Sequence, residues 1–203
     1  MGKLLILMDN KNKIKTLISS AVPIPVENID TDQIIPARFL KATSKKNFGE
    51  NLFRDWRFNN KNQLNPDFIL NNKNYSGEIL IAGSNFGCGS SREHAAWALK
   101  DYGFKVIISS FFADIFKMNA LNNNILPIQV SNETLKFFFD KIYKKPKIKF
   151  EVDLPNQVLN FNNNSINFDV DQYKKTCLIN GYDDIDFLVS KKEKINNFIN
   201  SKC

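Results

Sequence analysis

The chain has 203 residues, of which 43% are hydrophobic and 24% are charged. This composition suits one globular domain with its own core and excludes a disordered chain. The formal net charge of +7 would favour an anionic ligand or a polyanion. The lysines are spread over the whole chain, and no aromatic residues alternate with the densest groups. A basic nucleic-acid-binding module is therefore only a remote alternative, which salt-sensitive binding to generic DNA would support.

The cysteines and the apolar segments indicate the cellular compartment. Cys88, Cys177 and Cys203 have no metal-ligand spacing, so we expect free thiols in a reducing cytoplasm and no metal on this chain. No apolar run is long enough for a membrane span or a signal peptide, and no membrane partner is expected. Residues 1–14 are predicted to be a flexible extension, with Met1 or Met8 as the start.

The N-terminal third predicts little regular structure. A short strand is expected at residues 15–18. Three prolines in residues 22–36 exclude a helix and disfavour a central strand, so this segment is predicted to be an ordered, extended loop. The polar residues 44–66, with several aromatic side chains among them, predict a surface excursion that could serve as a lid or an interface.

The middle of the chain predicts a parallel β-α-β-α-β unit. Buried strands are expected at 79–82, 106–108 and 125–128, because each is a short apolar run. Helices are expected from Ser90 or Ser91 to Tyr102, with Gly103 as C-cap, and over 113–121. Consecutive strands joined by helices in this way form right-handed parallel units.

The C-terminal part predicts antiparallel strands and a helical tail. A helix is expected over 134–143, and Asn- or Pro-rich turns separate the predicted strands 147–152, 157–161 and 165–168. Short helices near 184–188 and 192–199 make 190–203 a helical tail. Taken together, residues 1–203 predict a single α/β domain with a mixed sheet and a β-rich C-terminal part.

Residues 83–96 carry the candidate chemistry, between a strand and a helix. Ligands of α/β proteins bind at the carboxyl ends of strands, and helix N-termini attract anions. Ser90 and Glu93 also match a capping box, which alone would imply no function. The glycine-rich loop, the second hydroxyl at Ser91 and the cation at Arg92 exceed what a cap needs. No P-loop or nucleophile elbow is present.

This pattern fits recognition of a carboxylate by Arg92 through two parallel hydrogen bonds. One serine would then face the reacting carbon and act as a base, with its alkoxide stabilised by backbone N–H groups and Arg92. His94, the single histidine, is expected to have a packing or supporting role, and Cys88 is expected to fill space in the loop.

Several motifs resemble the aconitase superfamily. The run Asn85–Ala96 is similar to the signature of its swivelling domain, and Asn28–Lys41 looks like the opening motif of that domain in the bacterial isopropylmalate isomerase small subunits. Shorter matches extend the resemblance from about residue 22 to about residue 189; they lie at 53–58, 65–68, 97–104, 112–116 and 180–183.

The resemblance implies a three-layer β/β/α swivelling domain and a hydro-lyase of leucine biosynthesis that interconverts 2-isopropylmalate and 3-isopropylmalate. It implies a [4Fe–4S] cluster on a separate large subunit, and thus activity only in a heteromeric complex acting on a small dicarboxylate. The three thiols here agree, because they are too scattered to hold a cluster. The alternative is the small subunit of a related homoaconitase or methylmalate-type hydro-lyase.

Site residues carry over from the resemblance position by position. Ser90 matches the proton-abstracting serine, Ser91 and Arg92 match substrate-carboxylate contacts, and Asp32 matches an active-site aspartate. Aconitases have a further arginine after the opening motif, where this chain has Lys41, Ala42 and Thr43. These three residues form the expected specificity loop, suited to a substrate with an apolar branch in place of a third carboxylate.

Overall fold

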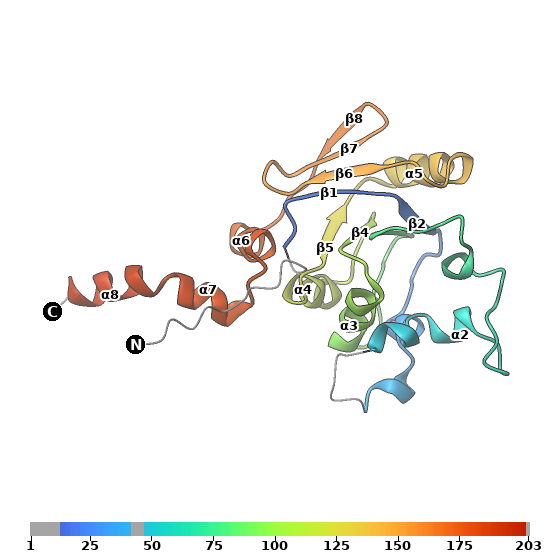
Figure 1. Cartoon of the computed structure of the whole chain (residues 1–203), viewed down its shortest axis with the longest axis horizontal. Coiled ribbons are helices and arrows are strands. Elements are labelled where there is room, and N and C mark those ends of the chain that lie inside the picture. The colour runs from blue at the N-terminus through green and yellow to red at the C-terminus, as the bar shows by residue number, and fades with distance from the viewer. Residues whose placement is uncertain (1–12, 42–46, 202–203) are drawn as a thin grey trace.

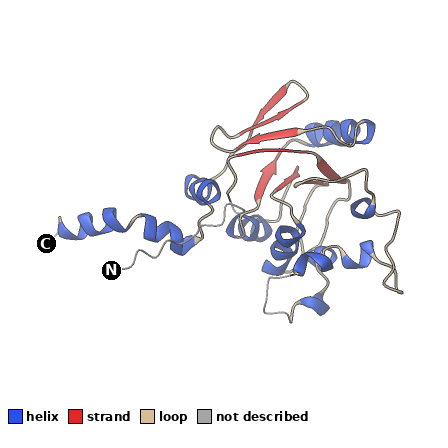
Figure 2. Cartoon of the chain, in the orientation of Figure 1, coloured by secondary structure: helices blue, strands red, loops and turns tan. Residues whose placement is uncertain are grey.

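The computed structural model describes residues 13–41 and 47–201. Within them, two four-stranded sheets lie one above the other, and helices cover the far side of the second sheet (Figures 1 and 2). The layers are therefore an antiparallel sheet, a parallel sheet and helices. This confirms the β/β/α architecture that the resemblance implies, with each kind of strand pairing confined to its own sheet.

The parallel sheet is the central layer. Its order is β2 (Ala21–Ile24), β3 (Ile79–Ala82), β4 (Val106–Ser109) and β5 (Leu126–Gln129). Nearly every residue of these strands is buried, as expected where both faces of a sheet are covered. Pro23 and Pro127 lie in the two edge strands, where a missing N–H is tolerated. The segment predicted to be a loop from residue 22 thus begins as an edge strand.

The antiparallel sheet covers one face of the parallel sheet. Its order is β1 (Thr16–Ser19), β6 (Phe150–Asp153), β7 (Val158–Phe161) and β8 (Asn164–Asn167). The buried, inward-facing residues of β6 and β7 alternate with half-buried ones, and Phe150 stacks on Phe161 with ring centroids 4.2 Å apart. Helix α5 (Asn132–Lys144) closes this core with Phe138, which packs edge-on against both rings.

The opposite face of the parallel sheet packs against α3 (Glu93–Tyr102) and α4 (Asp114–Asn122). The alanines of α3 are buried, so this helix approaches the sheet closely, as small residues allow. Gly103 ends the helix with a left-handed φ of 115°, as the sequence predicts. These two helices follow β3 and β4, and their N-termini meet at the carboxyl edge of the sheet.

The prediction that residues 44–66 form a surface excursion is wrong for much of the described part of this segment. The segment containing η3 (Phe48–Asn51) and α2 (Arg54–Arg57) packs into the core beside α3. Phe48 and Phe53 are almost fully buried, and the Gly49 N–H donates to the Asp101 carboxylate at 2.8 Å. The aromatic residues of this polar segment bury apolar surface, which outweighs its polar composition. The short helical turns α1 (Thr31–Ile34), η2 (Ala37–Phe39) and η4 (Ile69–Asn71) connect the remaining parts.

The C-terminal helices are α6 (Gln172–Asn180), α7 (Asp184–Ser190) and α8 (Lys192–Asn200). Helix α6 was not predicted, because its mostly polar sequence lacks an apolar stripe; Asp171 starts it as N-cap. Ile14 is buried and its N–H donates to the Leu178 carbonyl at 2.9 Å, so the described end of the predicted flexible extension packs on α6. Helices α7 and α8 extend away from the sheets (Figure 1). None of the described helices is long and apolar enough to cross a membrane.

Candidate active site

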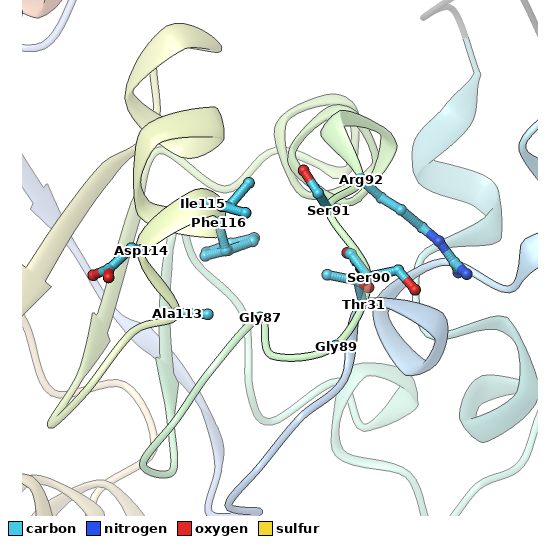
Figure 3. Close-up of a pocket in the computed structure, with 10 residues that line it drawn as sticks. All are labelled: Thr31, Gly87, Gly89, Ser90, Ser91, Arg92, Ala113, Asp114, Ile115 and Phe116. Carbon is cyan, nitrogen blue, oxygen red and sulfur yellow. Dashed lines mark hydrogen bonds between the residues drawn. The ribbon is translucent and has the colours of Figure 1, made fainter.

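A cavity of about 250 Å³ opens at the carboxyl edge of the parallel sheet, between the N-termini of α3 and α4 (Figure 3). Its walls come from three segments: α1, the glycine-rich loop after β3, and the loop after β4 with the start of α4. The lining residues are Thr31, Gly87, Gly89, Ser90, Ser91, Arg92, Ala113, Asp114, Ile115 and Phe116. The structure therefore brings Ser90, Ser91 and Arg92 together on one wall, which we call the serine wall.

Two glycines let the loop follow this path. Gly87 and Gly89 have φ angles of +78° and +84°, a region that side chains disfavour. A Cβ at Gly87 would collide with the Phe116 ring, and one at Gly89 with the Asp30 carboxylate. The loop thus packs directly against α4 on one side and against the start of α1 on the other.

Thr31 fixes the backbone that carries Ser90. Its N–H donates to the Cys88 carbonyl at 2.9 Å, and its hydroxyl donates to the Ser90 carbonyl at 2.8 Å. Thr31 is 2% exposed, so both bonds are shielded from water. The segment after β2 is therefore bonded to the loop after β3 on both sides of Gly89.

The predicted capping box at Ser90 is wrong. Helix α3 begins at Glu93 with Arg92 as N-cap, and no side chain caps it. The hydrogen bonds from Thr31 hold Ser90 before the helix, and the Glu93 carboxylate accepts from Asn123 Nδ2 at 3.0 Å instead of folding back. Ser90 is exposed at the cavity, and its hydroxyl does not cap the helix.

Arg92 forms an ion pair with Asp32 through Nη1 and Oδ1. The Arg92 side chain is 15% exposed and that of Asp32 is 47% exposed, so the guanidinium is the more enclosed partner. Figure 3 shows the Arg92 side chain extending away from α4. This pair explains how a cation is tolerated at a helix N-terminus, and it joins the predicted Asp32 to the predicted Arg92.

The second wall of the cavity, at the start of α4, was not predicted to be part of the site. Ala113, Ile115 and Phe116 face the serine wall across the cavity. The signal was available, because loops that follow neighbouring parallel strands meet at the same edge of the sheet. Strand β4 neighbours β3, so its following loop should have been expected beside Ser90.

The remaining predicted residues are placed as follows. The His94 ring packs against Trp97 and Phe48, with centroid distances of 4.4 and 5.6 Å, in keeping with a packing role. Burial, and then the nearby Asp30 carboxylate, raises the pKa of the Cys88 thiol, which does not suit a nucleophile. Lys41 is exposed and does not line the cavity, while Ala42 and Thr43 lie outside the described residues.

The described residues do not fit an iron–sulfur cluster. Such a cluster needs several thiolates around one point. The described part of the chain has two free cysteines, Cys88 and Cys177, and no group of three His, Cys, Asp or Glu residues that could hold a metal.

Comparison with known proteins identifies the family. The family model of the aconitase C-terminal domain matches residues 11–133. A 3-isopropylmalate dehydratase small subunit from Karelsulcia muelleri is 58% identical over 92% of this chain and 95% of its own length. The same subunit from Christiangramia forsetii is 61% identical over 92% of each chain. This chain belongs to the family of 3-isopropylmalate dehydratase small subunits.

A crystal structure of a 3-isopropylmalate dehydratase from Methanocaldococcus jannaschii shows the same fold. It is 26% identical and covers 90% of this chain and 98% of its own, with a TM-score of 0.65. The matched family model spans β1 to the start of α5. The cavity between the serine wall and α4 thus lies within the part of the chain that matches the aconitase C-terminal domain.

Proposed function

We propose that this chain is the small subunit of a heteromeric hydro-lyase that interconverts 2-isopropylmalate and 3-isopropylmalate in leucine biosynthesis. The observation that carries the proposal is the wall of Ser90, Ser91 and Arg92, which lines a cavity at a strand-to-helix turn. The chain around this wall is 58% and 61% identical to two dehydratase small subunits. A small dicarboxylate is the substrate. The complex works in the cytoplasm, where the free Cys88 and Cys177 thiols suit a reducing environment.

Arg92 is proposed to bind a substrate carboxylate. Its guanidinium is largely enclosed and paired with the Asp32 carboxylate, which supports an anion-binding role for this position. A planar guanidinium can hold a carboxylate through two parallel hydrogen bonds. Ser91, on the same wall, would donate its hydroxyl to the same anion, and Asp32 would keep the Arg92 fork oriented.

Ser90 is proposed to move the proton. As an alkoxide it would accept the proton from the substrate carbon next to a carboxylate, and the electron pair of that C–H bond would form the C=C bond as hydroxide leaves. The resulting Ser90 hydroxyl would return the proton to the intermediate during rehydration. A serine can act in this way only if nearby donors stabilise its alkoxide, and the N-terminus of α3 with Arg92 would supply them.

Departure of hydroxide requires an electrophile that the described residues do not provide. We propose that a [4Fe–4S] cluster on the large subunit supplies it, as the resemblance to aconitases implies. The cavity opens at the surface of this chain, so a second polypeptide can approach a substrate held there. No membrane and no nucleic acid takes part in the proposal.

The alternative is a related hydro-lyase for homoaconitate or a methylmalate. The second wall of the cavity favours the isopropyl substrate, because it is apolar at Ile115 and Phe116 and offers no cation for a third carboxylate. Lys41 does not line the cavity and gives homoaconitate no support.

The test uses the purified complex of this chain with its large subunit, kept anaerobic. We expect faster turnover of 3-isopropylmalate than of homoaconitate. Ser90→Ala should lower kcat by roughly 100-fold or more, while leaving the complex assembled. Ser165→Ala, an exposed serine on β8, is the matched control and should be unaffected. A preference for homoaconitate would contradict the substrate, and near-normal turnover by Ser90→Ala would contradict the base.

A further inference from the structure

The second wall of the cavity, formed by Ala113, Ile115 and Phe116, is apolar and could contact an apolar branch of the substrate. We infer that Ile115 lines the subsite for the isopropyl group and is a specificity-determining residue. The inference rests on the proposed function, and it places selectivity on α4 in addition to the predicted loop at Lys41.

The two walls differ in chemistry. Ser90 and Ser91 present hydroxyls on one side, with the charged Arg92 beside them, whereas the α4 side presents aliphatic and aromatic carbon. In Figure 3 the Ser91 and Ile115 side chains lie on facing sides of the cavity, and the Asp114 carboxylate points away from it. A malate with an isopropyl branch has the same division into polar and apolar halves.

The separation of the walls is fixed by the fold. The Phe86 N–H donates to the Phe111 carbonyl at 3.1 Å, and the Ala113 N–H donates to the Phe86 carbonyl at 3.1 Å. Gly87 also packs against the Phe116 ring, with no room for a side chain between them. These contacts tie the start of α4 to the glycine loop, so Ile115 is held at a set position relative to Ser91.

The exposure of Ile115 is not explained by packing within this chain. Phe112 and Phe116 are each 2% exposed and supply the contact of this segment with the core, whereas Ile115 is 49% exposed. A large apolar side chain left half in water at a cavity is a typical contact for an apolar ligand group. Met118, about one turn further along α4, is 53% exposed and does not line the cavity.

This pair of residues gives a matched test in the reconstituted complex. The values of kcat/KM are measured for 3-isopropylmalate and 3-methylmalate, which differ in the size of the branch. Ile115→Ala should lower kcat/KM about tenfold for 3-isopropylmalate and less than about twofold for 3-methylmalate. Ile115→Val should fall between wild type and Ile115→Ala. Met118→Ala should leave the ratio of the two values unchanged.

Three results would overturn the inference. An equal loss on both substrates would mean that Ile115 serves assembly or folding and not branch recognition. No loss on either would mean that the branch does not contact it. A wild-type complex that turns over neither malate would contradict the proposed function itself, whereas the first two results would leave that function standing.

Discussion

Thr31 shows how one side chain can set the geometry of this cavity. It contacts the loop on both sides of Gly89 and is nearly fully buried, yet it has no acidic or basic group of its own. The resemblance in sequence pointed to its neighbour Asp32 and not to Thr31. A threonine hydroxyl that donates to a backbone carbonyl 59 residues away leaves no local pattern in the sequence.

Replacing Thr31 tests its role in holding Ser90. Thr31→Val keeps the shape and removes the hydrogen bond to the Ser90 carbonyl, so Ser90 should be less well placed. We expect kcat to fall roughly tenfold with KM nearly unchanged, because misplacing a reacting group lowers the rate more than binding. Thr31→Ser should restore kcat.

Thr176→Val removes a similar bond, from a threonine hydroxyl to the Gln172 carbonyl in α6, and is the control. It should change neither constant. If Thr31→Val raised KM and left kcat intact, Thr31 would be supporting substrate binding and the positioning of Ser90 would need another explanation.

Helices and strands could be predicted from the sequence where neighbouring residues determine them, and could not where distant contacts do. The strands and helices from β3 to β5 were predicted closely, since each strand is a continuous apolar run and Gly103 marks the end of α3. The start of α3 was not, because Thr31 draws Ser90 away from the helix. Helix α6 was missed because packing against Ile14, and not an apolar stripe, supports it.

The same distinction holds for the residues of the candidate site. Ser90, Ser91 and Arg92 are adjacent in the sequence and could be found from it, whereas the Ile115 wall comes from a neighbouring strand's loop and needed the sheet order. The Arg92–Asp32 pair joins positions 60 residues apart. The resemblance pointed to both residues, but their pairing is a result of the fold.

Lys100, on α3, should make the free energy of unfolding depend on pH. Its Nζ donates to the Asn124 carbonyl at 3.1 Å, and burial, with a smaller effect of Lys105, lowers its pKa from 10.5 to about 8. Between these values the unfolded chain binds the proton and the folded chain does not. The free energy of unfolding should therefore rise with pH across this window.

Comparison of wild type with Lys100→Met isolates this effect. Urea unfolding at about pH 7 and about pH 10 should show the wild type gaining roughly 2 to 3 kcal/mol relative to the variant. Lys61→Met, at an exposed position, is the control and should follow the wild type. Parallel pH profiles for wild type and Lys100→Met would show that Lys100 is not held in a desolvated position.

For the whole molecule, the proposed function makes this fold one half of an active site. The antiparallel sheet and α5 form a core on one face of the parallel sheet, away from the cavity, and the helical face supports both walls. The groups that would bind and deprotonate a substrate lie on this chain. The described residues offer no ligand set for the electrophile that the reaction needs.

The most direct test of this account is a mixing experiment under anaerobic conditions. This chain, the large subunit proposed to carry the cluster, and their mixture are each assayed for dehydration of 3-isopropylmalate at equal concentrations. We predict turnover only in the mixture, saturating as this chain is titrated into the large subunit. Turnover by this chain alone at the rate of the mixture would contradict the claim that it holds half of the active site.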